Sequence, residues 1–201
     1  MASIAVDKAA LRGFRTGRFL VRPFQAGDYA RWKAAYLAQF PKQNEFDEDP
    51  KRARELTRLE FAKMLRKHRR FRQDRVIYWY AVVERKTGRL VGQVLLALVE
   101  RYNVQSARIS YFIFNNYWKH GFGHEVADGV VEFAFRRLKL HRLDAEILPG
   151  NRASVALARR IGMQPEGVRR RAVYVKGRWR DHLIWAITAE DRGIVMRPLV
   201  F

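Results

Sequence analysis

Two glycines separated by one residue mark the part of this sequence that is best suited to hold an anion. The segment 112–125 has the pattern of a strand, a loop and the turn His120-Gly121-Phe122-Gly123, and a helix is expected from Gly121 to Leu138. The N–H groups in the first turn of a helix lack partners within the helix, and together with the helix dipole they attract anions. Glycine lets the backbone close around a phosphate without a clash. We therefore predict a phosphate-binding turn, with Lys119 adding positive charge; the alternative is a tight turn ahead of a helix.

This turn differs from the two common nucleotide-binding motifs. The third glycine of a dinucleotide fingerprint would fall on Val126. A Walker loop would need a Gly-Lys-Ser/Thr sequence, which does not follow. The expected ligand is therefore a phosphate-bearing cofactor of another kind.

A second polar pair follows the next predicted strand, which covers residues 142–148. Asn151 begins a helix that ends at Gly162, and Ser154 lies one turn into it. The simpler interpretation is helix capping, with the Asn151 side chain accepting from the amide of Ser154. In the functional interpretation the side-chain amide of Asn151, which both donates and accepts, holds an amide-rich ligand. Capping alone does not explain the pairing of Asn151 with the glycine turn.

The composition limits the classes of protein to consider. The chain has 201 residues, 48% of them apolar, which suits one domain with a real core. It contains no cysteine, which excludes disulfides, thiolate zinc sites and a cysteine nucleophile, and it is compatible with the cytoplasmic location that we expect. No apolar run is long enough to span a bilayer, and no signal peptide or spaced metal-ligand motif is present, so we predict neither a membrane partner nor a metal.

The charge is strongly positive. Forty Lys and Arg against twenty Asp and Glu leave a net charge of +20. Such a field attracts polyanions and repels cationic substrates, so an acidic protein, RNA, a ribosome or an anionic cofactor fits as a partner. Basic residues are dense on the helix expected over 50–70 and just beyond it, where the segment 51–75 is either a solvated face or a docking surface.

These residues must be positioned by a small set of elements. The hydrophobic patterns predict strands over 19–24, 77–84, 90–99, 107–114, 142–148, 172–176 and 179–188, and helices over 29–39, 50–70, 121–138 and 151–162. Asp28 is expected to cap the first of these helices. The order indicates a single α/β (α+β) domain with a mixed, mostly antiparallel sheet of about seven strands flanked by helices. We expect an N-terminal extension over 1–17, the domain over 18–191 and a C-terminal tail over 192–201.

The order of the motifs resembles the GNAT superfamily of acyl-CoA N-acyltransferases, and more narrowly its branch of ribosomal-protein N-terminal acetyltransferases. The resemblance covers roughly 19–191. It is carried by Leu20-Val21-Arg22-Pro23-Phe24 with Asp28, the glycine turn, Leu140-His141-Arg142-Leu143, Asn151-x-x-Ser154, Arg160-Ile161-Gly162-Met163-Gln164-Pro165-Glu166-Gly167 and Asp181.

The resemblance implies acetyl-CoA as the donor and a sheet that is splayed at its centre. The pantetheine arm would run in the splay between the strands 107–114 and 142–148. Trp118 is a departure, because the family often has Gln or Arg at that position. The cofactor-binding residues implied are Lys119, His120, Gly121, Phe122, Gly123 and His124 for the pyrophosphate; the backbone of Phe112, Ile113 and Phe114 with the side chain of Asn151 for the pantetheine; Ser154 near the sulfur; and Arg160 for the 3′-phosphate.

By the same resemblance, a neutral amine attacks the thioester directly. The N–H near Ile113 would stabilise the oxyanion, and a hydroxyl would protonate the leaving thiolate. Many relatives use a Tyr seven residues after the Asn, but here that position is Ala158, so Ser154 is the expected acid. Glu100 and Glu146 are the candidate bases, although each fits an ordinary surface carboxylate as well.

A desolvated site with a water relay and no dedicated base is a further alternative. Asp181 and His182 are expected to form a structural pair, and His120 is expected to anchor its loop.

The acceptor remains open at this level. The leading hypothesis is N-acetylation of a protein N-terminus, for example that of a ribosomal protein, by a monomer or homodimer. The alternatives are a small-molecule amine acetyltransferase and a catalytically idle module that binds RNA or ribosomes through the basic segment 51–75.

Overall fold

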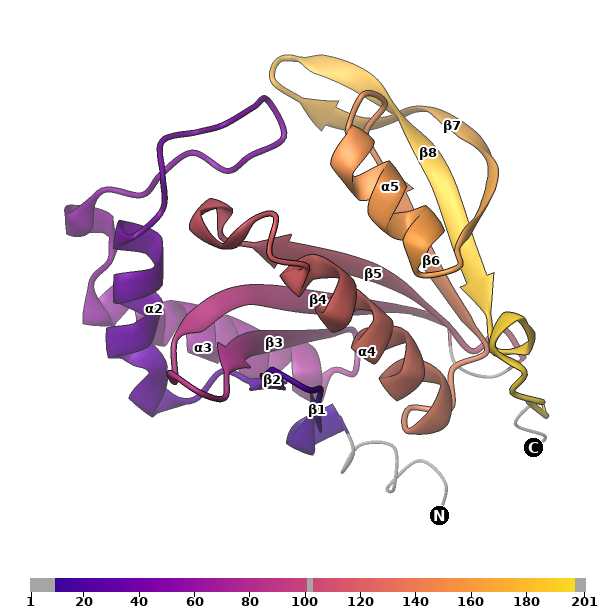
Figure 1. The fold of residues 1–201 in the computed structure, drawn as a ribbon, viewed down its shortest axis with the longest axis horizontal. Helices are drawn as coiled ribbons and strands as arrows, with labels where there is room; N and C mark the ends of the chain where they lie inside the picture. The colour runs from indigo at the N-terminus through magenta and orange to yellow at the C-terminus, as the bar shows by residue number, and fades with distance from the viewer. Residues whose placement is uncertain (1–9, 101–102, 198–201) are drawn as a thin grey trace.

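One sheet of eight strands runs through the part of the chain that the computed structural model describes, residues 10–100 and 103–197 (Figure 1). The strand order is β1-β2-β3-β4-β5-β6-β8-β7, and only the β5–β6 pair is parallel. The predicted mixed, mostly antiparallel sheet is therefore confirmed. Its strands are β1 (Phe14–Arg15), β2 (Phe19–Pro23), β3 (Ile77–Glu84), β4 (Leu90–Glu100), β5 (Ser106–Ile113), β6 (Arg142–Ile147), β7 (Gln164–Val175) and β8 (Arg178–Thr188).

The strand count exceeds the expected seven because of β1, which lies in the segment expected to be an extension. Phe14 pairs with Val21 of β2, so residues 14–15 extend the sheet. Strand β7 begins at Gln164 instead of residue 172, because its exposed first half lacks the alternation of apolar residues that identifies a strand. The predictions for residues 1–9 and 198–201 lie outside the described residues.

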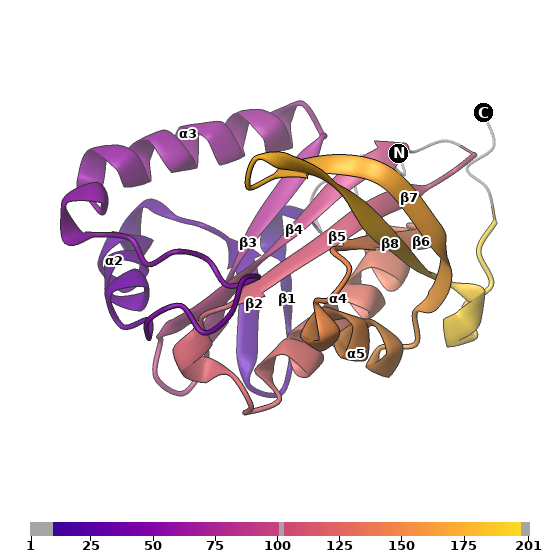
Figure 2. The same cartoon turned by 90° about the horizontal axis from the view of Figure 1, so that it is seen from above.

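Helices α2 and α3 cover one face of the sheet and α4 and α5 the other (Figures 1 and 2). They are α2 (Tyr29–Leu37), α3 (Arg58–Gln73), α4 (Phe122–Arg136) and α5 (Arg152–Arg160), with short 3-10 helices η1 (Ala26–Asp28), η2 (Ala53–Glu55), η3 (Asn115–Tyr117) and η4 (Glu190–Arg192). No helix in the described segments is long and apolar enough to cross a membrane.

The start of α3 and the cap of α2 differ from the prediction. Helix α3 begins at Arg58 and not at Pro50, because Thr57 caps it by accepting a hydrogen bond from the Glu60 amide. Asp28 precedes α2 but does not cap it. Its carboxylate instead accepts two hydrogen bonds from the Arg22 guanidinium, at 2.7 and 2.8 Å.

The two faces of the sheet have separate hydrophobic cores. The larger lies under α4, whose buried residues Val126, Val130 and Phe133 recur at helical spacing. The smaller lies under α2 and α3 and is centred on aromatic side chains such as Trp32 and Phe114. The tail residues Ile194 and Met196 pack against the larger core, so this part of the tail lies on its own domain.

The centre of the sheet opens where the two parallel strands part. Strands β5 and β6 pair only from Ser106 with Arg142 to Arg108 with Asp144. Beyond that point β5 continues along β4, while β6 continues along β8. The splay predicted from the resemblance is therefore present, and it opens toward the end of β5 that leads into the glycine turn.

Candidate active site

The glycine turn introduces α4 with a backbone that only glycine adopts easily. Gly121 immediately precedes the helix with φ of +73°, in the left-handed region. Gly123 differs, because an added Cβ would meet the side chain of Leu157 at 3.5 Å, an ordinary contact. The free N–H groups of the first turn of α4, preceded by a left-handed residue, form the kind of concavity that binds anions.

Arg18 lies beside this turn, although sequence reasoning missed it. Its backbone N–H and Nε donate to the carboxylate of Glu125 at 2.7 and 2.5 Å, and its Nη1 donates to the carbonyl of His120 at 3.0 Å. Burial by itself would raise the pKa of Glu125, but hydrogen bonds from Thr16 and Arg18 hold it below its usual value. No local pattern signals this contact, because it joins the β1–β2 turn to a helix far along the chain.

A hollow of about 910 Å³ lies between α4 and the segment 13–18, and it is lined by arginines and by the carboxylates of Glu125, Asp128 and Glu132. Three of the predicted cofactor residues, Gly121, His124 and Arg160, line it together with Arg18. Arg160 comes from the end of α5, so the fold brings it to the same hollow as the turn. Clustered guanidinium groups are suited to phosphate.

Trp118 and His120 anchor the loop. The Trp118 indole Nε1 donates to the carbonyl of Ile113 at 2.7 Å, which ties the loop to the end of β5. Nδ1 of His120 lies 2.7 Å from the carbonyl of Trp118. The departure from Gln or Arg at position 118 thus has a structural explanation.

At the end of β5, the backbone N–H and C=O groups of successive residues point alternately toward β4 and toward the splay. The amide of Phe114 donates to the carbonyl of Val91, beside β4, at 3.0 Å. Because backbone groups alternate along a strand, those of Ile113 point to the opposite edge, toward β6. Phe112 and Phe114 therefore turn their backbone toward β4, and of the three predicted residues only Ile113 presents its N–H to the splay.

Asn151 and Ser154 occupy the α5 wall of the splay. Asn151 Oδ1 accepts from the Ser154 amide at 3.2 Å, so the capping interpretation is confirmed, and the side-chain NH2 group of Asn151 takes no part in this cap. The side chain of Ser154 lies close enough to Tyr111 on β5 to act on its phenol. Burial raises the pKa of Tyr111 to about 12, and the neighbouring Ser154 hydroxyl acts in the opposite direction. Tyr111 was missed because its partner is set by the β5–α5 geometry.

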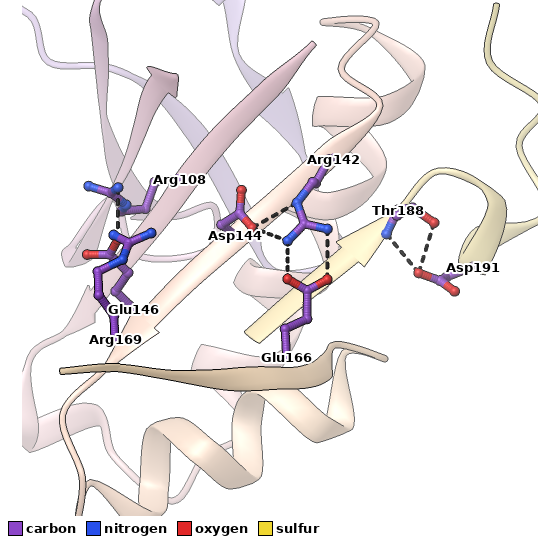
Figure 3. A network of polar contacts seen from close by, with 8 residues as sticks. All are labelled: Arg108, Arg142, Asp144, Glu146, Glu166, Arg169, Thr188 and Asp191. Carbon is purple, nitrogen blue, oxygen red and sulfur yellow. Dashed lines mark hydrogen bonds and ion pairs between the residues drawn. The ribbon is translucent and has the colours of Figure 1, made fainter. Parts of the chain in front are cut away.

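Charged residues gather on the other face of the splay. Glu146 of β6 lies between Arg108 of β5 and Arg169 of β7 (Figure 3), and its Oε1 contacts the Arg108 Nη2 at 2.8 Å. Its Oε2 lies 3.1 Å from Nδ1 of His182. Asp181 does not pair with His182 as expected but accepts from the Arg171 amide at 2.7 Å, because consecutive strand residues point to opposite faces.

The structure does not test Glu100 as a candidate base, and it does not test the prediction that no metal is bound. Glu100 ends β4, and the structure does not describe its side chain. Among residues 10–100 and 103–197, no three His, Asp or Glu side chains gather closely enough to hold a metal ion.

The loop between α2 and α3, residues 38–57, reaches the same region. Asn115, which follows β5, donates from Nδ2 to Asp47 Oδ2 at 2.9 Å and accepts at Oδ1 from the Phe40 amide at 2.7 Å. Lys176 of the β7–β8 turn donates to the carbonyl of Glu45 at 2.9 Å. This loop therefore links the end of β5 to the β7–β8 hairpin on the α2–α3 side of the sheet.

Comparison with known proteins places the chain in a family. Residues 18–164 match the family model described as acetyltransferase (GNAT) domain. The chain is 34% identical over 114 residues to the probable N-acetyltransferase YjcK of Bacillus subtilis (strain 168), a match that covers 57% of this chain and 63% of YjcK. It is 23% identical over 121 residues to an Escherichia coli (strain K12) N-acetyltransferase whose name specifies an alanine of ribosomal protein uS5, with 60% of this chain and 62% of that protein covered. The curated relatives are thus matched over less than two thirds of their length.

The fold agrees with solved structures. It matches Mycobacterium smegmatis RimJ in complex with CoA-disulfide with a TM-score of 0.73 and 24% identity, over 88% of each chain. The splay and the turn before α4 thus occur in a sequence that matches the family model over most of its length. The chain belongs to the GNAT acetyltransferase family.

Proposed function

We propose that this protein is an acetyl-CoA-dependent N-acetyltransferase that transfers an acetyl group to a primary amine, namely a protein N-terminal α-amine. One observation carries the proposal: the splay between β5 and β6 opens between the neighbouring hydroxyls of Tyr111 and Ser154 and the end of β5 that leads to the left-handed turn at Gly121. A long donor with phosphates at one end and a reactive thioester at the other fits such a path.

The residues present fit the donor. The first turn of α4 and Lys119 would hold the pyrophosphate, and Arg160 would reach the 3′-phosphate in the same hollow. The pantetheine amides would meet the side-chain amide of Asn151, since the carbonyl of Ile113 already accepts from Trp118 Nε1. No contact in this arrangement requires a metal ion.

The chain's own groups account for the acid and the oxyanion donor. As the amine nitrogen bonds to the acetyl carbon, the carbon–sulfur bond breaks and its electrons move to sulfur. The N–H of Ile113 donates to the developing oxyanion. The pair Tyr111–Ser154 gives a proton to the thiolate; the phenol of Tyr111 is protonated at neutral pH, and its raised pKa makes it a weaker acid than an exposed tyrosine. The base was predicted to be Glu100 or Glu146, and both assignments stay predictions.

An α-amine suits this chemistry better than a lysine. With a pKa of about 8, an α-amine is about 10% neutral at pH 7, whereas a lysine of pKa about 10.4 is about 0.04% neutral. The similarity to an enzyme named for a ribosomal-protein alanine supports a ribosomal acceptor. The net charge of +20 supports approach to an acidic or RNA-containing partner.

Two measurements test the proposal in sequence. Acetyl-CoA at about 100 times its dissociation constant should stabilise the fold by about 2.7 kcal/mol in thermal unfolding. Dephospho-CoA should bind more weakly to the wild type, and Arg160→Ala should remove that difference. Absence of any shift would overturn the donor assignment.

The acceptor is then tested by CoA release with pairs of peptides. One peptide has a free N-terminus, and its partner is N-terminally blocked and carries an internal lysine. Turnover of the free N-terminus is expected. Turnover confined to the blocked peptide, or to small amines, would overturn the acceptor assignment.

A further inference from the structure

His182 and Glu146 form a close pair at the mouth of the splay. They come from the adjacent antiparallel strands β8 and β6, and Nδ1 of His182 lies 3.1 Å from Oε2 of Glu146. Both side chains are only 13% exposed. Glu146 is two residues beyond Asp144, the last residue of β6 that pairs with β5, so the pair stands where the splay begins.

The other oxygen of Glu146 is already occupied. Oε1 contacts the guanidinium groups of Arg108, at 2.8 Å, and of Arg169 (Figure 3). Strands β5, β6, β7 and β8 thus each supply one member of this cluster. The two arginines fix the carboxylate and leave Oε2 toward the imidazole.

We propose that His182 is the general base that removes the proton from the acceptor amine, and that Glu146 is a positioning residue behind it. A carboxylate beside Nδ1 favours the tautomer with its proton on Nδ1, which leaves the lone pair on Nε2. Within the described residues, Nε2 of His182 makes none of the hydrogen bonds or ion pairs observed. The Nδ1 contact is within ion-pair distance but is not aligned as a hydrogen bond, and such contacts commonly tighten when substrate binds.

The location fits a base opposite the acid. Arg108 and Tyr111 are separated by an odd number of residues on β5, so their side chains lie on opposite faces of the sheet. Tyr111 and Ser154 therefore face the α4–α5 side, whereas the cluster of Arg108 and Glu146 faces the α2–α3 side. Ser110, two residues beyond Arg108 on the same face, is exposed, so an amine can reach the splay from that side.

The proton transfers balance in this arrangement. The amine lone pair forms the bond to the acetyl carbon, and the electrons of the carbon–sulfur bond leave with sulfur. The proton on the amine nitrogen passes to Nε2 of His182, and Glu146 stabilises the imidazolium that results. The thiolate takes its proton from Tyr111–Ser154 on the opposite face. This inference rests on the proposed transfer to an amine.

The experiment measures kcat and KM against pH for the wild type, His182→Gln and Glu146→Gln. We expect His182→Gln to lower kcat by about 100-fold or more, with the KM for acetyl-CoA little changed, and to remove the acidic limb of the pH profile. Glu146→Gln should move that limb to lower pH, because the imidazolium loses its anionic partner while Arg108 and Arg169 remain. Added imidazole should partly restore His182→Gly.

A matched control is His141, whose Nε2 pairs with Glu190 at 2.9 Å outside the splay. His141→Gln should keep the wild-type kcat and pH profile. A folded His182→Gln with wild-type kcat and an intact acidic limb would overturn the inference. If His182→Gln does not fold, the inference is overturned instead by a Glu146→Gln variant whose acidic limb lies at the wild-type pH. A wild type that binds acetyl-CoA but turns over no amine would overturn the proposed function, and this inference with it.

Discussion

The two faces of the splay differ in how they are built. On the α4–α5 face the polar groups are a hydroxyl pair, Tyr111–Ser154, beside the larger hydrophobic core. On the α2–α3 face the polar groups are charged, and four strands contribute to the cluster around Glu146. In the proposed mechanism the two faces have different roles. The α4–α5 face holds the neutral proton donor, Tyr111–Ser154, and the α2–α3 face holds the charged residues that support the proton acceptor, His182.

A second ion-pair network on β6 sharpens this contrast. Arg142 binds both Asp144 Oδ1, at 2.6 Å, and the carboxylate of Glu166 on β7 (Figure 3). The hydrogen bond and charge of Arg142 lower the pKa of Glu166, despite opposing burial. This network lies at the closed end of the β5–β6 pair and binds β6 to β7. The Glu146 cluster lies at the open end and leaves one imidazole nitrogen free.

The largest effects are expected from substitutions on the α4–α5 face, where Tyr111 and Ser154 lie. Ser154→Ala and Tyr111→Phe should each lower kcat by about 100-fold if both hydroxyls belong to one proton path. The double variant should then be little worse than either single variant, because residues that act as a unit are not additive. Steady-state kinetics on the peptide substrate measure this. Unchanged kcat in Ser154→Ala would remove Ser154 from the path.

The α2–α3 face should be the more sensitive to acid. His68 of α3 is 9% exposed and stacks on Trp79, and its pKa is lowered to about 4, first by burial and then by Lys67 and Arg72. Because the unfolded pKa is about 6.5, the stability it contributes is present above that pH and is lost as pH falls toward about 4.

Urea unfolding at pH 7 and pH 5 measures this loss. The wild type should lose about 2 kcal/mol more between these values than His68→Phe, which keeps a ring on Trp79 but does not titrate. Equal losses would show that His68 is not the source of acid sensitivity.

Asn115 follows β5 and holds the α2–α3 loop. Asn115→Ala removes buried hydrogen bonds to Phe40 and Asp47 and should cost about 2 kcal/mol of unfolding free energy. The KM for the acceptor should rise more than the KM for acetyl-CoA. Asn116→Ala is the neighbouring control and should cost less, because Asn116 Oδ1 has no partner among the described residues.

The smallest effects are expected in the glycine turn, where Gly121 is proposed to set the backbone conformation and Gly123 to allow close approach of phosphate. Gly121→Ala forces a left-handed alanine and should destabilise the fold by about 1 kcal/mol. Gly123→Ala meets only an ordinary contact with Leu157, so stability should be kept, while the KM for acetyl-CoA rises if phosphate approaches this backbone. Isothermal titration with CoA distinguishes the two, and unaltered affinity in Gly123→Ala would contradict close approach there.

Local patterns in the sequence were enough for most elements. The aromatic and β-branched run over 77–84 predicted the bounds of β3, and the cap at Asn151 with Gly162 predicted α5. The turn at Gly121 was identified because glycine is typical of a positive φ and because an apolar helical pattern follows it. The exposed first half of β7 has no comparable sequence pattern, because a polar edge strand lacks a buried face.

Only the tertiary structure decided which side chains meet. Tyr111 with Ser154, Glu146 with His182 and Arg18 with Glu125 each join segments that are distant along the chain. The sequence by itself determined most of the elements and the glycine turn before α4, since these depend on neighbours within a few residues. The make-up of the two faces of the splay depends on strand register and on where β5 leaves β6, and those are set by packing across the whole sheet.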